Sequence, residues 1–230
     1  MIKLGCNAML RAAEKLPHPA KEDPGNWIEV SELVRRIRDW RLDIVDFQLF
    51  RGFASKDPAY MRALKILCQR SGLPIGFLGV GRGFVGEANG LGVALSAPEL
   101  DQRIAEVKEG VDLAAFMGAP LIRLFAGAIP PESPDRDALW QTVVASFQQV
   151  CEYAATMGVL VGLHNHAPVV APSGDDVLRL LHDVDRENFT FILDTGWWPG
   201  APGTAPLGPR SSDDFYAHME QTAPHASYVS

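Results

Sequence analysis

Short apolar runs alternate with longer amphipathic segments along the whole chain. The apolar runs lie at Ile2–Asn7, Ile44–Phe50, Leu73–Val80, Leu121–Phe125, Val159–His164, Phe189–Asp194 and Ala226–Ser230. Each run has the length of a strand, and the segments between them are long enough to form helices. Neighbouring parallel strands need a helical crossover, so this order predicts a parallel sheet with right-handed strand–helix–strand connections.

Two of the segments between the strands carry an apolar stripe of helical period. The stripe of segment 97–117 consists of Leu100, Ile104, Val107, Val111 and Ala114. The stripe of segment 134–157 consists of Leu139, Val143, Phe147, Val150 and Ala154. Because these residues recur every three or four positions, they predict helices that pack one face on the sheet. Gly158 is expected to end the second helix, and Ser173 is expected to cap the next one.

The composition is that of a globular protein. The chain has 230 residues, of which 47% are hydrophobic and 21% charged, and its net charge is −7. We expect a single domain over residues 1–230. Phosphate binding needs clustered Lys and Arg, so the acidic balance argues against nucleic acid as a partner. The sequence also lacks an apolar run long enough to cross a membrane and the pattern of a signal peptide.

The three cysteines, Cys6, Cys68 and Cys151, have no metal-ligand spacing. An odd number of thiols without a paired pattern is typical of a reducing compartment. We therefore expect a cytoplasmic protein with buried free thiols.

The number of predicted strands is one short of a closed (β/α)8 barrel of the TIM type. Seven strands and six helices would leave unpaired backbone groups on the first and last strands. Either another chain covers these edges, which would make a homo-oligomer, or the sequence is a C-terminally shortened version of a longer protein. We favour the second interpretation. It predicts roughly 50 further residues beyond Ser230 that supply the last strand–helix unit.

Two strand endings carry residue types from which active sites are built. The run that ends at His164 continues into Asn165 and His166, and a second run ends at Asp194. In a repeating strand–helix protein, active sites gather at the carboxyl ends of the strands. Residues two apart on a strand share a face, so His164 and Asp194 are expected to meet there. Imidazole and carboxylate together suit Zn²⁺, Mn²⁺ or Fe²⁺, or a hydrogen-bonded pair without metal.

Further polar residues interrupt or follow the apolar runs. Arg123 lies within a run, and its guanidinium is expected to clamp a substrate hydroxyl or phosphate, or else to pair with an acid such as Asp46. Asp46 and Gln48 end the second strand and are expected to contact substrate, unless Asp46 serves Arg123. His166 either contacts substrate or satisfies a backbone carbonyl.

Two tryptophans follow Asp194 directly. Trp197 and Trp198 offer aromatic faces on which a sugar ring can stack, or they plug the space beneath the Pro- and Gly-rich segment 199–210. The remaining histidines belong to no constellation and are expected at the surface: His18, His182, His218 and His225.

Several motifs, in this order, resemble the xylose isomerase-like family of sugar phosphate isomerases and epimerases. They are the runs Gly118–Gly127, Gly158–His166, Ile192–Gly196 and Met219–Pro224, so the resemblance covers essentially the whole chain. The resemblance implies a (β/α)8 barrel and chemistry on a sugar, sugar phosphate or polyol. It also implies a divalent metal, Mn, Zn, Mg or Fe, held by acids and a histidine from the later strands.

The match to the family's metal ligands is partial. Asp194 falls on the metal-binding aspartate of the sixth strand, which makes it an expected metal ligand and catalytic residue. His164 stands where the family commonly has a Glu, and Trp197 and Trp198 stand where it often has His or Gln. His164 and Asp194 therefore either bind metal and move protons, or form a hydrogen-bonded polar pair.

The resemblance implies metal-assisted proton transfer between neighbouring carbons, as in an isomerase or epimerase. Alternatives are a dehydratase of the inosose or dehydroshikimate type and a non-catalytic carbohydrate-binding barrel that has lost its metal ligands. A DNA-repair endonuclease, which shares the fold, is disfavoured by the acidic balance and by the single matching acid.

Overall fold

The computed structural model describes the greater part of the chain. The described residues are 3–8, 30–49, 55–81, 83–85, 94–127, 129, 133, 135–165, 170–171, 173–198 and 212–230. The strands are β1 (Gly5–Ala8), β2 (Ile44–Gln48), β3 (Ile75–Gly79), β4 (Leu121–Leu124), β5 (Leu160–His164), β6 (Phe189–Leu193) and β7 (Ala226–Val229). The helices are α1 (Val30–Asp39), α2 (Pro58–Arg70), α3 (Ala97–Met117), α4 (Arg136–Thr156), α5 (Gly174–Val184), α6 (Ser212–Thr222) and the 3-10 helix η3 (Ala223–His225).

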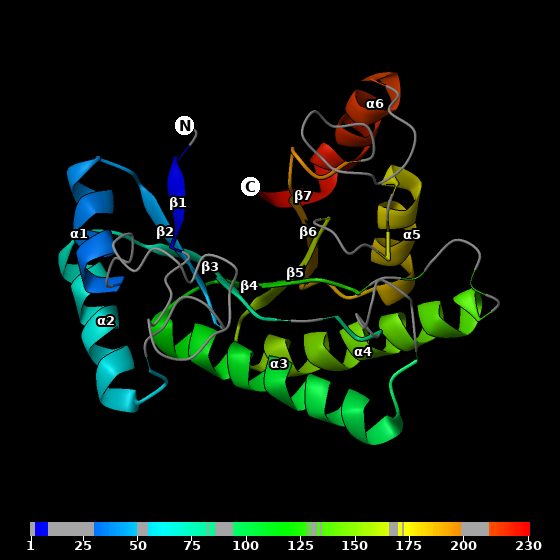
Figure 1. The fold of residues 1–230 in the computed structure, drawn as a ribbon, viewed down its shortest axis with the longest axis horizontal. Coiled ribbons are helices and arrows are strands. Elements are labelled where there is room, and N and C mark those ends of the chain that lie inside the picture. Colours follow the sequence, from blue (N-terminus) through cyan, green and yellow to red (C-terminus); the bar gives the residue numbers. More distant parts are fainter. Residues whose placement is uncertain are drawn as a thin grey trace, which may run out of the picture. The chain divides into compact units, whose positions relative to one another are not determined.

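Strands and helices alternate as the hydrophobic pattern predicts (Figure 1). The order of the strands in the sheet is their order in the chain, and β1–β2, β2–β3, β5–β6 and β6–β7 pair in parallel. The predicted fold class, a parallel strand–helix repeat of (β/α)8 type with seven strands, is confirmed for the described residues. The strand boundaries differ from the predicted ones by at most three residues, because strands end where backbone pairing ends rather than where apolar side chains end.

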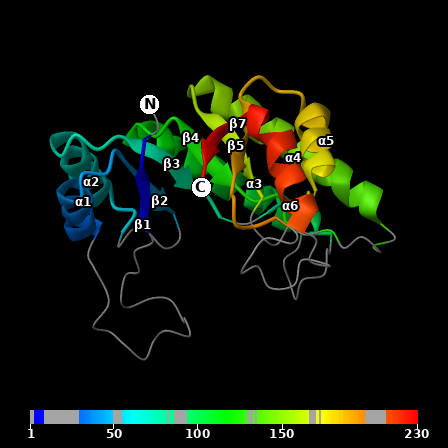
Figure 2. The same cartoon turned by 90° about the horizontal axis from the view of Figure 1, so that it is seen from above.

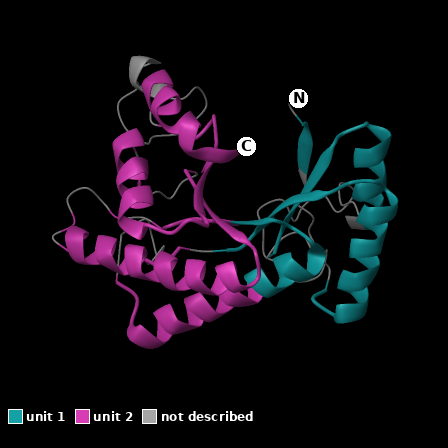
Figure 3. Ribbon diagram, turned by 180° about the vertical axis from the view of Figure 1, so that it is seen from behind, with its two compact units in different colours: residues 1–81, 110–122 teal, residues 82–109, 123–230 magenta. Residues whose placement is uncertain are grey.

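The chain forms two compact units, which Figure 3 colours separately. Unit 1 comprises residues 1–81 and 110–122, and unit 2 comprises residues 82–109 and 123–230. Unit 1 contains β1 to β3 with α1 and α2. Unit 2 contains β5 to β7 with α4 to α6, and these helices pack against one another in chain order (Figure 1, Figure 2).

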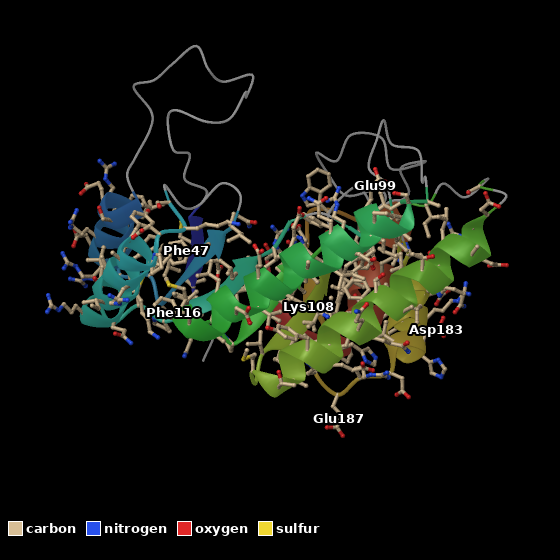
Figure 4. The ribbon with its side chains drawn as sticks, turned by 90° about the horizontal axis from the view of Figure 1, so that it is seen from below. Phe47, Glu99, Lys108, Phe116, Asp183 and Glu187 are labelled. Carbon is tan, nitrogen blue, oxygen red and sulfur yellow. The ribbon has the colours of Figure 1, made fainter. Side chains whose placement is uncertain are left out.

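The core of unit 2 lies between its strands and the apolar stripes of its helices. All five residues of the predicted α4 stripe, Leu139 to Ala154, are buried. Phe147 of this stripe packs its ring on Phe84 at 5.1 Å and on Phe189 at 4.7 Å between centroids. On the outer side, Lys108 of α3, labelled in Figure 4, lies over the ring of Tyr153.

Two helix ends lie where the sequence predicted them. Ser173 caps α5, since its hydroxyl accepts a hydrogen bond from the Asp176 backbone N–H at 3.1 Å. Gly158 has a φ of +66° and follows the end of α4, where the chain turns into β5. Among the described residues, no helix has the length and apolar character that a membrane span requires.

Candidate functional site

Three polar side chains of unit 2 lie at the carboxyl ends of successive strands. Arg123 is in β4, His164 is the last residue of β5, and Asp194 directly follows β6. The register pairs His164 with Ile192, so Asp194 comes two residues later, on the same face. We call these residues the Arg123–His164–Asp194 row. The sequence predicted that His164 and Asp194 would meet, and the structure brings them together.

Arg123 fixes the tautomer of His164. The Nη1 of Arg123 lies 3.2 Å from the Nδ1 of His164. A guanidinium can only donate, so Nδ1 accepts and the neutral ring carries its proton on Nε2. The Arg123 Cζ also lies 4.4 Å from the centroid of the Phe125 ring, which stacks beneath the guanidinium. Arg123 therefore has a partner that the sequence analysis did not name.

The Nε2 of His164 points towards the carboxylate of Asp194. Nε2 and Oδ2 are 3.4 Å apart, which is long for a hydrogen bond, and the side chains are 5% and 15% exposed. The other carboxylate oxygen, Oδ1, accepts a hydrogen bond from the Gly196 backbone N–H at 2.8 Å. Oδ2 is thus the oxygen that faces the imidazole.

Asn165 holds the backbone of Asp194 in place. Its side-chain Nδ2 donates to the Asp194 carbonyl at 2.9 Å, and its Oδ1 accepts from the Asp194 N–H at 2.7 Å. Sequence reasoning missed this role. The usable signal was the side-chain amide directly after β5, because an amide can donate to and accept from one neighbouring backbone residue at the same time.

A small recess of about 10 Å³, room for about one water molecule, adjoins His164 in unit 2. Its lining is mainly apolar, with His164 and Asn165 as the polar members, and consists of Ala126, Leu163, His164, Asn165, Val170, Ala171 and Val177.

Two of the other predicted site residues belong to unit 1. Asp46 and Gln48 are buried in unit 1, where the Asp46 carboxylate accepts a hydrogen bond from the Phe77 N–H at 3.0 Å. Their contact with substrate, and the pairing of Asp46 with Arg123, stay predictions. Trp197 is half-buried after Asp194, and its role also stays a prediction. His166 and the segment 199–210 lie outside the described residues.

Trp198 and His218 stack on each other, so the half-buried His218, expected at the surface, has partners that the sequence did not indicate. Trp198 is fully buried, and its ring stacks on His218 at 5.3 Å between centroids. The Nδ1 of His218 accepts a hydrogen bond from the Gly174 N–H at the start of α5, at 3.1 Å. The sequence around His218 gave no sign of this partner.

The arrangement of His164 does not fit a divalent metal on that residue. A metal-binding histidine donates from its second ring nitrogen, usually to a carboxylate or carbonyl oxygen. Here the second nitrogen faces Arg123, which has no acceptor. Among the residues that the structure describes, no group of three His, Cys, Asp or Glu side chains is placed to hold a metal ion.

The family model described as xylose isomerase-like TIM barrel matches residues 21–221. No curated protein gives a significant match.

Solved structures of this architecture resemble the chain along almost its whole length. The probable 3-DHS dehydratase AsbF of Bacillus anthracis has a TM-score of 0.67 at 17% identity, and D-psicose 3-epimerase of Clostridium cellulolyticum H10, solved with D-tagatose, has 0.69 at 14%. Each match covers 99% of this chain and 72% of the other. A xylose isomerase-like protein of Mycobacterium smegmatis, solved with magnesium, has 0.64 at 15% and covers 99% and 73%. At these identities the likeness establishes the fold.

Proposed function

Because the chain belongs to the xylose isomerase-like TIM barrel family, we propose that it is an isomerase of a small sugar, sugar phosphate or polyol. The observation that carries the proposal is the Arg123–His164–Asp194 row, which sets a carboxylate, a neutral imidazole and a fixed positive charge side by side. Sites at the carboxyl ends of barrel strands are where this fold performs its chemistry.

In the proposed reaction, Asp194 is the base. Its Oδ2 removes a proton from the carbon that bears a hydroxyl next to the substrate carbonyl. The electrons of that C–H bond form the double bond of an enediolate, and the carbonyl oxygen takes the negative charge. The Nε2–H of His164 donates a hydrogen bond to this oxygen, since a neutral imidazole can stabilise an enediolate. The proton of the neighbouring hydroxyl passes to the former carbonyl oxygen, so that the hydroxyl oxygen becomes the new carbonyl. The proton on Asp194 is then delivered to the carbon that bore the original carbonyl.

The described Arg123–His164–Asp194 row holds one carboxylate, which favours isomerisation over epimerisation. One base removes and returns a proton on the same face of the substrate, which moves the carbonyl by one carbon. Inversion at one carbon needs a second acid on the opposite face. In the row, Asp194 is the one carboxylate that faces His164. Epimerisation would need a further acid from elsewhere in the protein.

A dehydratase is the second candidate. It is favoured by the likeness in fold to the probable 3-DHS dehydratase, although that likeness concerns the fold alone. The same enediolate would then expel the hydroxyl of the next carbon, which leaves as water with the proton that Asp194 has taken. A carbohydrate-binding protein without catalysis is the third candidate.

The test is incubation of the full chain with a panel of ketoses, aldoses and cyclic polyol ketones in D₂O, followed by NMR. An isomerase interconverts ketose and aldose and introduces deuterium at carbon. Inversion without carbonyl movement would identify an epimerase, and loss of water with a new alkene signal would identify a dehydratase. Sugar binding without exchange at any carbon would refute the enzymatic proposal.

A further inference from the structure

The partner of His164 decides which of its ring nitrogens carries the proton. In the family pattern that the sequence resembles, acids and a histidine hold the metal. A histidine that binds a metal through Nε2 keeps its proton on Nδ1 and donates it to an oxygen. The structure has the reverse arrangement, because the group beside Nδ1 is the guanidinium of Arg123, 3.2 Å away.

We infer that Arg123 is a positioning residue that fixes His164 as the Nε2–H tautomer and thereby keeps a divalent metal off the His164–Asp194 pair. With a metal on Nε2, the Nδ1 of His164 would have two options. It could lose its proton, which makes the ring an imidazolate, or it could keep a proton that points at the N–H of Arg123. Both are unfavourable at a buried site. The fixed charge of Arg123 then stands beside the imidazole in place of a metal charge.

The surroundings hold this geometry in place. Arg123 is 7% exposed and lies over the Phe125 ring, and this ring also packs on His164 with 5.6 Å between centroids. Turning the imidazole over would take Nδ1 away from Arg123 and Nε2 away from Asp194, putting ring carbons in their places. The observed ring orientation is therefore the one that serves both neighbours.

The role of Arg123 in catalysis rests on the proposed function. The tautomer of His164 and the metal affinity of the His164–Asp194 pair do not. Both are measurable without turnover, so a failed isomerase assay leaves them standing. A wrong tautomer would refute the inference even if the isomerase assay succeeded.

The first test is ¹⁵N NMR of the histidine rings in the full chain. We expect His164 to give a pyridine-type signal for Nδ1 and a pyrrole-type signal for Nε2. The signals are assigned by their loss in His164→Gln or, if that variant does not fold, by their proximity to the Phe125 ring. Protonation of Nδ1 in the neutral ring would overturn the inference.

The second test is Zn²⁺ titration by calorimetry, comparing the wild type with Arg123→Gln and Arg123→Lys. A Gln side chain can accept a hydrogen bond from Nδ1–H, whereas Lys can only donate. We expect Zn²⁺ affinity to rise about tenfold or more in Arg123→Gln and to stay low in Arg123→Lys. The gain should disappear when His164→Gln is added, which separates this site from surface histidines.

Wild-type Zn²⁺ binding that is lost in His164→Gln would overturn the inference. So would an unchanged affinity in a folded Arg123→Gln variant. If Arg123→Gln does not fold, the comparison of the wild type with His164→Gln, together with the NMR spectrum, decides the outcome.

Discussion

Asn165 and Asp194 are joined by two reciprocal hydrogen bonds between a side-chain amide and a backbone. The bond from Nδ2 to the Asp194 carbonyl is 2.9 Å long, and the bond from the Asp194 N–H to Oδ1 is 2.7 Å long. The amide thereby links the end of β5 to the end of β6 beyond the last ladder pair. It also fixes the point from which the Asp194 carboxylate extends towards His164.

We predict that Asn165→Ala weakens both folding and activity. The variant leaves a donor and an acceptor of the Asp194 backbone without partners, so the free energy of unfolding should fall by about 2–3 kcal/mol. Chemical denaturation measures this change. The loss of carboxylate position should lower the rate of deuterium exchange into substrate.

Asn188→Ala is the matched control, because its side-chain amide donates to the carbonyls of Cys151 and Val159 before β6, where the strand begins. It should lower stability by a similar amount and leave the exchange rate of the folded protein unchanged. Equal loss of activity in both variants would contradict a positional role for Asn165.

The carboxylate of Asp183 makes stability depend on pH. The Trp140 Nε1–H donates to it at 2.8 Å, and this hydrogen bond is the main reason that the pKa of Asp183 is lowered. A lowered pKa in the folded protein adds stability above the ordinary aspartate pKa of about 4, and this stability is lost as the pH falls through the folded value. The side chain is 28% exposed, so the effect is modest.

We therefore predict that Asp183→Asn lowers the free energy of unfolding by about 1 kcal/mol at pH 7, and by less at pH 3. Denaturation at both pH values measures it. Glu187→Gln, in the turn after α5, serves as the control and should have an effect within about 0.5 kcal/mol; Figure 4 labels both residues. A loss that is the same at both pH values would contradict this explanation.

Gly83 is required by a close approach of two backbone segments. A Cβ at this position would lie 2.1 Å from the Gly127 backbone N, and the next residue, Phe84, donates its N–H to the Ala126 carbonyl at 3.1 Å. Backbone atoms cannot yield as a flexible side chain can. Gly83→Ala should therefore destabilise the protein by about 2–3 kcal/mol.

Thermal unfolding tests this prediction, with Gly158→Ala as the control. Gly158 has a φ of +66° but open space around it, so its substitution costs only backbone strain, about 1 kcal/mol. A smaller loss for Gly83→Ala than for Gly158→Ala would contradict the close approach.

Two of the three thiols should resist alkylation in the folded protein. Burial raises the pKa of Cys68 and of Cys151 to about 12, and the thiolate is the reactive form. Iodoacetamide at pH 8 should leave both unmodified in the native protein and modify them after unfolding, as read by mass spectrometry. Rapid native modification of either residue would contradict its burial.

The hydrophobic pattern was sufficient to predict the strand–helix order and the apolar face of α4. The meeting of His164 and Asp194 was also predictable, because strand period and parallel pairing determine it. These features depend on local sequence and on the rule that residues two apart on a strand share a face.

The partners within the site were not predictable in the same way. The hydrogen bond between Arg123 and His164 was not named from the sequence, and the pairing of Arg123 with Asp46 stays a prediction. The amide clamp of Asn165 and the Trp198–His218 stack join residues 29 and 20 positions apart, and both depend on side-chain packing. Whether His164 can bind the metal implied by the family resemblance depends on the same kind of detail, because the guanidinium of Arg123 keeps the proton of His164 on Nε2.

The most direct test of proton transfer without a metal is deuterium incorporation from D₂O into a ketose substrate by chelator-treated protein. The account predicts that exchange persists in the wild type and in Asp185→Asn, a control at an exposed left-handed position that suits Asn. It predicts a loss of about 10²- to 10⁴-fold in Asp194→Asn. Exchange that stops on chelation and returns with Mn²⁺, or that survives in Asp194→Asn, would contradict it.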